Sequence, residues 1–480
     1  MEETEIAGEV QEAAQQAAFP MQKRWRSRFH LEIPFGVWQN PGGIIFHNGE
    51  YHVYCPWHRR GKDKTCWFHL HTRDFVHYSR PERVDWPELQ TDAAAGCVYL
   101  EEGKLQMLSS DAYHPEDGMR SICLHTAHLG PHGRVEAGES FSLDIPHGYA
   151  VYSGVPSLFE RGGRRYLALG AQNPQKRGCV LLYVEAGDGW YFQDELHTQL
   201  TAFGTSWEAP RLLRFGLQDA LLLSPQGVAA EPCAYENACI SGYLAGEYSV
   251  EGKALLHGDF QELDHGFDFY APHYVSHEGR NILIGWLGMP GQTADYPSVP
   301  QGWRYVLTMP RMLMLRRGHI YAQPVAELKA LRILDTAQEA LLEHTRTASI
   351  GLPETAELLL DISLGRATIL DFTLAYGLER IYMHYDREQQ LFRISREAMK
   401  LGGRGVRTFR LNGHMSFSLQ LFVDKTVVEL FLQHGEETAS FFVFPEKNIV
   451  PEFSVAADAD MDRVAMQTWE LDALRFSVSS

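Results

Sequence analysis

Residues 43–54 read GIIFHNGEYHVY, two short apolar segments on either side of the dipeptide Asn48-Gly49. An Asn-Gly pair between such segments favours a β-hairpin, because both residues tolerate the positive φ angles that a tight type I′ turn requires. This stretch therefore predicts one hairpin, and similar units recur along the chain.

Four further hairpin units, each with a turn glycine between two apolar strands, occupy residues 97–108, 156–169, 211–223 and 273–286. The five turn glycines are Gly49, Gly103, Gly163, Gly216 and Gly279. Their spacing of about 55 to 60 residues is long enough for a four-stranded sheet in each repeat. Five such sheets predict a five-bladed β-propeller over residues 28–325. The alternative is an irregular β-rich domain with commonplace glycine turns.

A propeller places the first strand of each blade along a central channel, whose mouth forms a concave pocket. In four repeats a proline precedes the turn glycine by six to eight residues: Pro41, Pro156, Pro210 and Pro272. The residues just before these prolines are Asn40, Val155, Glu208 and Asp268. We expect these four residues to converge on one pocket at the channel axis.

The second part of the chain has a different pattern. Residues 326–332 are predicted to form a short helix within a linker at 326–345. From about residue 357 strands dominate, and alternating apolar residues mark 380–386, 391–396, 415–424 and 427–432. We therefore predict an all-β protein in which a β-sandwich over residues 346–480 follows the propeller. A polar segment, residues 1–27, precedes the propeller, and residues 9–18 of this segment are predicted to form a helix.

Composition and charge limit the classes of partner. The net charge of −18 disfavours nucleic acid and anionic lipid as partners. No apolar run approaches the ~20 residues that span a bilayer. Seven cysteines without a Cys-x-x-Cys pair indicate reduced thiols, and the acidic N-terminus lacks the apolar stretch of a signal peptide. We expect a cytoplasmic protein without a cofactor; the sequence predicts no oligomeric state.

A histidine pair and a basic loop could each form a binding site or have only a structural or surface role. His69 and His71 lie on one face of a predicted strand, but a metal ion needs three or four converging ligands, and no carboxylate or cysteine lies at ligand spacing beside them. Structural or surface histidines are therefore favoured over a metal site. The basic residues within 59–64 are interpreted as a solvated loop in preference to a docking site for a sugar phosphate.

Several motifs resemble those of one known family. Residues 34–43 (PFGVWQNPGG), followed by residues 48–52 (NGEYH), resemble the first signature of glycoside hydrolase family 32, the invertase and sucrose-6-phosphate hydrolase family. Four later stretches of this chain resemble further motifs of that family and occur in the same order: residues 207–210 (WEAP), 224–227 (SPQG), 265–272 (HGFDFYAP) and 427–431 (VVELF). The resemblance implies a propeller with a sandwich and retaining hydrolysis of terminal β-fructosides such as sucrose.

The resemblance also implies a role for each channel residue. Glu208 matches the acid/base carboxyl, whereas Asn40 stands where the family has its nucleophilic Asp and Val155 where it has an Asp that stabilises the transition state. An amide has no anionic oxygen with which to attack an anomeric carbon. Substrate contacts are implied for Gln39, Trp67, Trp207, Asp268, Tyr270 and Trp303.

Two hypotheses follow. The favoured one is a degenerate homologue that has lost most or all fructoside hydrolysis and binds a sugar, such as a fructoside or related glycoside, or a partner protein. The alternative is an active glycoside hydrolase with a changed substrate or mechanism, in which Glu208 is the acid and another carboxylate attacks or activates water. Asp268 is the first candidate for that carboxylate and Asp111 the second; an inverting pair would stand about 6.5 to 9.5 Å apart.

Overall fold

The computed structural model describes residues 24–32, 36–38, 42–58, 65–84, 96–110, 121–130, 135–152, 155–187, 189–290 and 296–477. Within these ranges, no helix is both long and apolar enough to cross a membrane. The predicted helix at 9–18, together with Gln39, Asn40, the basic residues of 59–64 and Asp111, lies outside the described residues.

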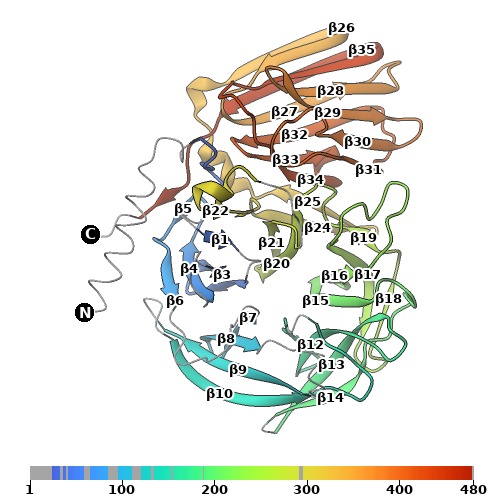
Figure 1. Cartoon of the computed structure of the whole chain (residues 1–480). Helices are drawn as coiled ribbons and strands as arrows, with labels where there is room; N and C mark the ends of the chain where they lie inside the picture. The colour runs from blue at the N-terminus through green and yellow to red at the C-terminus, as the bar shows by residue number, and fades with distance from the viewer. Residues whose placement is uncertain are drawn as a thin grey trace.

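Five sheets, built mainly from antiparallel strands of the first two thirds of the chain, surround a common axis, so the predicted five-bladed propeller is confirmed (Figure 1). Each sheet begins with one of the predicted hairpins. The innermost strands are β2 (Gly43–His47), β7 (Gly96–Glu101), β11 (Ser157–Arg161), β15 (Ser206–Phe215) and β20 (Phe269–His277). Their hairpin partners are β3 (Glu50–His58), β8 (Lys104–Ser110), β12 (Arg164–Gln172), β16 (Gln218–Gln226) and β21 (Arg280–Leu287).

Further strands complete each blade on its outer side. They are β4 (Thr65–Thr72), β9 (Ser121–Leu129), β10 (Val135–Asp144), β13 (Gly178–Ala186), β14 (Gly189–Glu195), β17 (Gly242–Ser249), β18 (Ala254–His257), β24 (Arg311–Arg316) and β25 (His319–Pro324). The turn glycines adopt the conformation that the hairpin pattern requires. Gly49 has a φ angle of 83° and Gly279 one of 74°, and glycine adopts such positive φ angles without the steric strain that a Cβ atom would cause.

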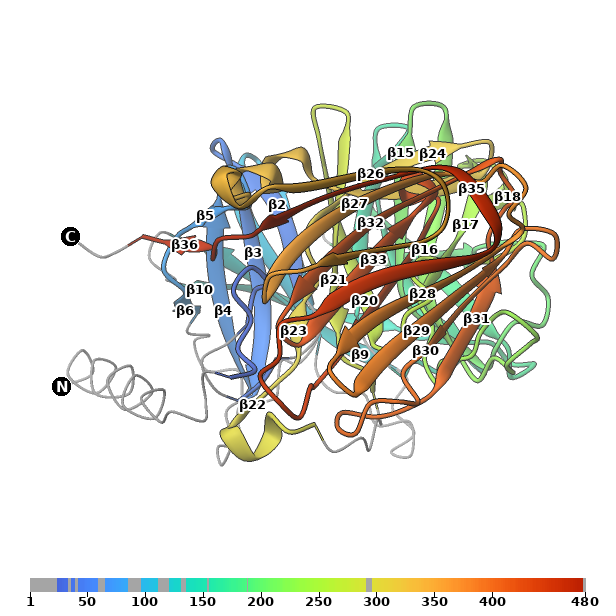
Figure 2. The ribbon, with the colours of Figure 1, turned by 90° about the horizontal axis from the view of Figure 1, so that it is seen from above.

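Short strands connect distant parts of the chain with the first blade. β1 (Gly36–Trp38) pairs in parallel with β22 (Trp303–Arg304), which follows β21 of the fifth blade. At the other end of the chain, β36 (Arg475–Phe476) pairs in parallel with β5 (His77–Tyr78) (Figure 2). The last strand therefore returns from the sandwich to the propeller.

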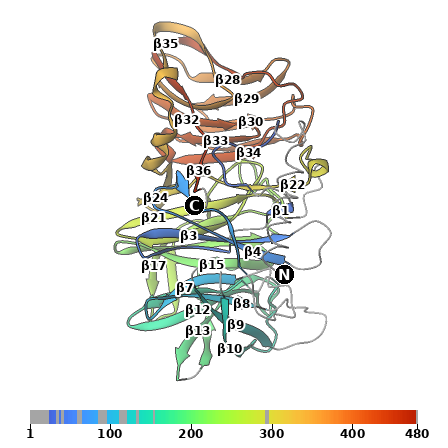
Figure 3. The ribbon, with the colours of Figure 1, turned by 90° about the vertical axis from the view of Figure 1, so that its left-hand side faces the viewer.

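The C-terminal strands curl into a β-sandwich, as predicted, and Figure 3 shows them stacked on one edge of the propeller. They enclose an apolar core in which Leu358, Phe372, Phe392 and Phe417 are buried. The strands are β26 (Gln338–Gly351), β27 (Thr355–Ser363), β28 (Ile369–Tyr376), β29 (Glu379–Asp386), β30 (Leu391–Ser395), β31 (Val406–Arg410), β32 (Ser416–Asp424), β33 (Val427–Leu432), β34 (Glu437–Phe442) and β35 (Glu452–Glu470).

The linker is shorter than the sequence suggested. The predicted helix exists as the 3-10 helix η5 (Ala326–Leu331), but β26 already begins at Gln338, inside the segment assigned to the linker. Most side chains in the first half of β26 are exposed, so the alternation of apolar and polar residues that marks a half-buried strand is missing there.

A buried polar network joins the two domains. The guanidinium of Arg311, on β24, lies 2.9 Å from Asp264 Oδ2 and 2.7 Å from Glu429 Oε2 on β33. Glu429 also lies 2.9 Å from the ring of His30, whose other nitrogen is 2.9 Å from Asp424. The network pairs these buried charges across the domain interface, and removing one partner would leave a buried charge uncompensated.

Candidate active site

Two β-bulges stand at equivalent points of the fourth and fifth blades. In β15 the pairing register shifts between Glu208 and Arg211, and in β20 between Tyr270 and His273. Each bulge contains an alanine with positive φ followed by a proline: Ala209 at 47° and Ala271 at 43°. Bulges re-aim neighbouring side chains and often lie beside active sites, and a left-handed residue other than glycine costs of order 1 kcal/mol or more. The bulges set the direction of Glu208 and Tyr270.

Glu208 and Tyr270 meet across the two blades. The Tyr270 hydroxyl donates a hydrogen bond of 3.1 Å to Glu208 Oε2, and Gln226 Nε2 donates one of 2.6 Å to the Tyr270 oxygen. Burial raises the pKa of Glu208, and the hydrogen bonds from Tyr270 and Gln226 oppose this rise only in part. A carboxyl with a raised pKa holds its proton at higher pH, as a general acid must.

A second layer of polar groups supports this pair. The Ser224 and Ser241 hydroxyls are 2.7 Å apart, and Ser241 Oγ accepts a hydrogen bond of 3.1 Å from the amide of Ala271 in the bulge. The thiol of Cys239 lies 3.5 Å from Gln226 Oε1. The sequence signalled Ser224 and Gln226 through the SPQG motif, whereas nothing in it marked Ser241 or Cys239.

The bulges also correct the predicted equivalence of Asp268 and Glu208. Counted from the bulge, the fifth-blade counterpart of Glu208 is Tyr270. Asp268 is fully buried, and its Oδ1 accepts a hydrogen bond of 2.7 Å from Tyr296. Its Oδ2 accepts bonds of 3.0 Å from Arg396 and 2.9 Å from the Phe442 amide, both in the sandwich. Both oxygens of Asp268 therefore face protein partners, and its use as a replacement carboxylate or substrate ligand stays a prediction that would require these contacts to break.

Three of the residues with implied substrate contacts are deeply buried tryptophans. Trp67, Trp207 and Trp303 have exposed fractions of 0%, 2% and 1%. A Cβ at Gly42 would lie 1.8 Å from the Trp67 ring, and one at Gly178 would lie 2.1 Å from the Trp207 ring. Rings buried this deeply present almost no face to a ligand, and the substrate contacts that the resemblance implies for these tryptophans stay a prediction.

Val155 lies beside the innermost strand of the third blade. Its side chain is buried, with 6% exposed. Two residues on, the Ser157 hydroxyl donates a hydrogen bond to the carbonyl of Pro210, in the bulge that follows Glu208. The segment that carries Val155 is therefore joined to the strand that carries Glu208, while Asn40 and Gln39 lie outside the described residues.

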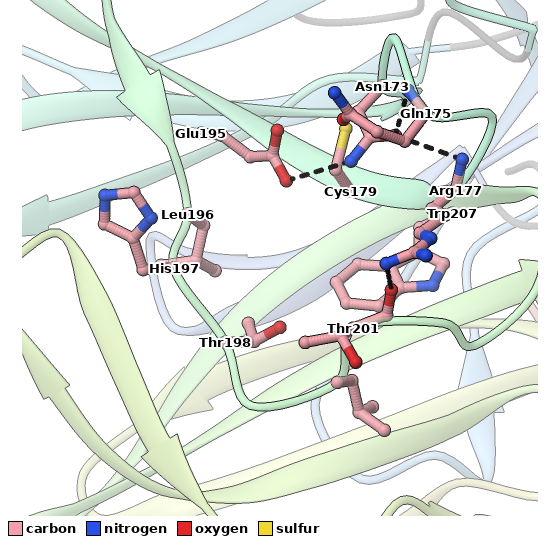
Figure 4. Close-up of a pocket in the computed structure, with 12 residues that line it drawn as sticks. Asn173, Gln175, Arg177, Cys179, Glu195, Leu196, His197, Thr198, Thr201 and Trp207 are labelled. Atoms are coloured by element: carbon pink, nitrogen blue, oxygen red, sulfur yellow. Dashed lines mark hydrogen bonds between the residues drawn. The ribbon is translucent and has the colours of Figure 1, made fainter.

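A separate polar cavity has Trp207 among its lining residues (Figure 4). It has a volume of about 180 Å³ and is lined by the β12–β13 turn and the segment after β14. Asn173 Nδ2 lies 3.5 Å from Glu195 Oε1, and Arg177 donates a hydrogen bond of 2.7 Å to the Thr201 carbonyl. No sequence motif indicated this cavity.

The histidines of the first blade form a polar cluster. His69 Nε2 lies 2.9 Å from His52 Nδ1, and His71 Nδ1 lies 2.9 Å from Glu50 Oε2. Burial lowers the pKa of His69 to about 3, and the charges of its histidine neighbours add to the shift. In the part of the chain that the structure describes, no three His, Cys, Asp or Glu side chains are arranged to hold a metal ion.

Comparisons with known proteins agree with this architecture. The chain is similar to the sucrose-6-phosphate hydrolase of Staphylococcus xylosus, with 30% identity over 444 residues that cover 89% of each chain. The structure of sucrose-6-phosphate hydrolase from Lactobacillus gasseri superposes with a TM-score of 0.83 at 22% identity, covering 98% of this chain and 97% of that one. A variant of the Bombyx mori GH32 beta-fructofuranosidase in complex with sucrose gives a TM-score of 0.79 at 22% identity, with all of both chains covered.

Two family models cover both domains. The model of the glycosyl hydrolases family 32 N-terminal domain matches residues 30–324, and that of the family 32 C-terminal domain matches residues 327–470. These ranges coincide closely with the propeller and the sandwich. The chain therefore belongs to glycosyl hydrolase family 32.

Proposed function

We propose that this chain is a sugar-binding member of the β-fructofuranosidase family in which hydrolysis of fructosides is absent or very weak. The observation that carries the proposal is Asn40 at the position of the family's nucleophilic Asp. A retaining mechanism forms a glycosyl-enzyme bond through a carboxylate oxygen, and the amide of Asn40 has no such anionic oxygen.

The position that stabilises the transition state supports the same proposal. An oxocarbenium-like transition state gains from a negative charge nearby, and a valine supplies none. The Val155 side chain is also buried, with 6% exposed, so it offers little surface to a ligand. Two of the three carboxylates that the family's chemistry uses are therefore missing.

Glu208 supports sugar binding. Its carboxyl is half-buried and hydrogen-bonded to Tyr270, and together with Gln226 these groups offer donors and acceptors suited to sugar hydroxyls. The Bombyx mori relative that was solved in complex with sucrose makes a fructoside the first ligand to test. We place the protein in the cytoplasm, in keeping with an odd number of cysteines, seven, and the lack of any Cys-x-x-Cys pair in the sequence.

The test combines binding and turnover. Sucrose, sucrose-6-phosphate and aryl glycosides are titrated into the protein by calorimetry, and hydrolysis is followed by release of reducing sugar. We expect saturable binding of a fructoside without turnover, and weaker binding by Glu208→Gln. The double variant Asn40→Asp, Val155→Asp should gain hydrolysis that is lost again when Glu208→Gln is added. Robust turnover by the native chain that Glu208→Gln abolishes would refute the proposal.

The raised pKa of Glu208 favours a second candidate, an active glycoside hydrolase in which Glu208 remains the acid. Its second carboxylate would be Asp268 only if the protein contacts of Asp268 broke, and Asp111 is the other candidate from the sequence. Native turnover that Asp111→Asn abolishes, with binding intact, would support this candidate. Binding of no sugar at all would redirect the search to a partner protein.

A further inference from the structure

Arg211 is a buried guanidinium in the wall of the central channel. It lies on β15 just beyond the bulge that follows Glu208, and its exposed fraction is 6%. Three residues of strand correspond to at most about 10 Å, so its position is distinct from that of Glu208. Its terminal NH2 group lies 2.6 Å from His273 Nε2 on β20, and within the described residues its Nε atom, like those of Arg311 and Arg396, has no hydrogen-bond partner.

Arg211 differs from the other deeply buried arginines of the described ranges. Arg311 has an exposed fraction of 1% and pairs with Asp264 and Glu429, and Arg396, at 3%, pairs with Asp268. Among the same residues, no Asp or Glu forms an ion pair with Arg211. A buried charge is costly unless it is paired, so an unpaired one in a folded protein calls for a counter-ion.

His273 cannot supply the missing charge. Burial lowers the pKa of His273 far below its usual value, and the neighbouring charge of Arg211 lowers it further. The ring is therefore neutral and accepts the hydrogen bond from Arg211 through Nε2. Burial lowers the pKa of Arg211 as well, but a guanidinium stays protonated in proteins, so the positive charge remains.

The neighbouring blades contribute small neutral groups. The Ser157 hydroxyl donates a hydrogen bond to the carbonyl of Pro210, the residue immediately before Arg211. Burial raises the pKa of the Cys97 thiol to about 12, although the charge of Arg211 opposes the rise, so this thiol is neutral too. Of the neighbours identified on three other inner strands, none carries a charge.

We propose that Arg211 binds a small inorganic anion inside the propeller channel. The expected charge is −1, since one guanidinium faces neutral neighbours and a dianion would need a second cation. Chloride fits this description. The anion would neutralise the channel wall and act as a structural ligand, whatever sugar binds at Glu208.

The first experiment measures thermal unfolding of the native chain in sodium gluconate against sodium chloride, bromide or phosphate at constant ionic strength. Binding to the folded state alone should raise the Tm with chloride or bromide in a saturable way, by a few degrees. The Arg211→Met variant should lose this dependence. Arg214→Gln, which changes an exposed arginine on the same strand, should keep it.

The second experiment needs no variant and therefore holds even if Arg211→Met fails to fold. Crystals of the native chain soaked in bromide should show anomalous density against the Arg211 guanidinium. The proposal is overturned by the absence of that density, by anion stabilisation that persists in a folded Arg211→Met, or by a response to phosphate alone, which would indicate a dianion site.

Discussion

Replacing Asp268 with Asn should destabilise the protein strongly, because this carboxylate holds the sandwich to the fifth blade. The substitution keeps the shape of the side chain but removes its charge. It leaves the Arg396 guanidinium, 3% exposed and 3.0 Å from Asp268 Oδ2, without its counter-charge. It also places an amide group where the carboxylate accepts bonds from Tyr296 and the Phe442 amide.

Breaking one side of a buried ion pair typically costs about 3–5 kcal/mol, and we expect that range for Asp268→Asn. The assay is urea denaturation followed by tryptophan fluorescence. Asp371→Asn is the matched control, since Asp371 is 64% exposed and pairs with His384 at the surface, where such pairs contribute about 0–1 kcal/mol. Adding Arg396→Met to Asp268→Asn should recover part of the loss, because the unpaired guanidinium is then gone.

The opposite outcome is equally specific. If Asp268→Asn unfolds within about 1 kcal/mol of the native chain but no longer binds or hydrolyses a glycoside, Asp268 acts on the ligand and its structural role is refuted.

Three further predictions concern pH, close packing and the acid. Burial lowers the pKa of His30, but the carboxylates of Asp424 and Glu429 outweigh this effect and raise the pKa to about 9. The stabilisation of the folded protein by protonated His30 is therefore complete below pH 6.5 and is lost as pH rises through 9. The native chain should lose roughly 3 kcal/mol over this interval in urea titrations, and an equal loss in His30→Gln would contradict the assignment. A Cβ at Gly170 would lie 2.1 Å from the carbonyl oxygen of the residue before Glu208, whereas one at Gly351 would meet nothing within 4 Å. Gly170→Ala should therefore lower the Tm, because overpacking costs about 1–3 kcal/mol, and should weaken sugar binding. Gly351→Ala is the control, and equal effects of this substitution would contradict the prediction. Tyr270→Phe removes a hydrogen bond that lowers the pKa of Glu208, so this pKa should rise further in an NMR titration, and an unchanged value would exclude the contact.

The sequence alone predicted the propeller because its evidence is local. A hairpin such as that around Gly49 or Gly279 depends on a few neighbouring residues, and five copies at even spacing define the blades. The order of motifs along the chain likewise indicated the family, including the place of Glu208. The exposed first half of β26 escaped prediction because its side chains lack the alternation of a half-buried strand.

Only the tertiary structure decided which side chains near the channel can meet a ligand. Bulges at Ala209 and Ala271 bring Tyr270 to Glu208, while Asp268 faces Arg396 across the domain interface. A one-residue shift in a strand reverses the face of every side chain that follows, and counting residues from a proline does not reveal such shifts. Burial of Trp207 and the unpaired charge of Arg211 depend on contacts between blades, which no local pattern in the sequence records.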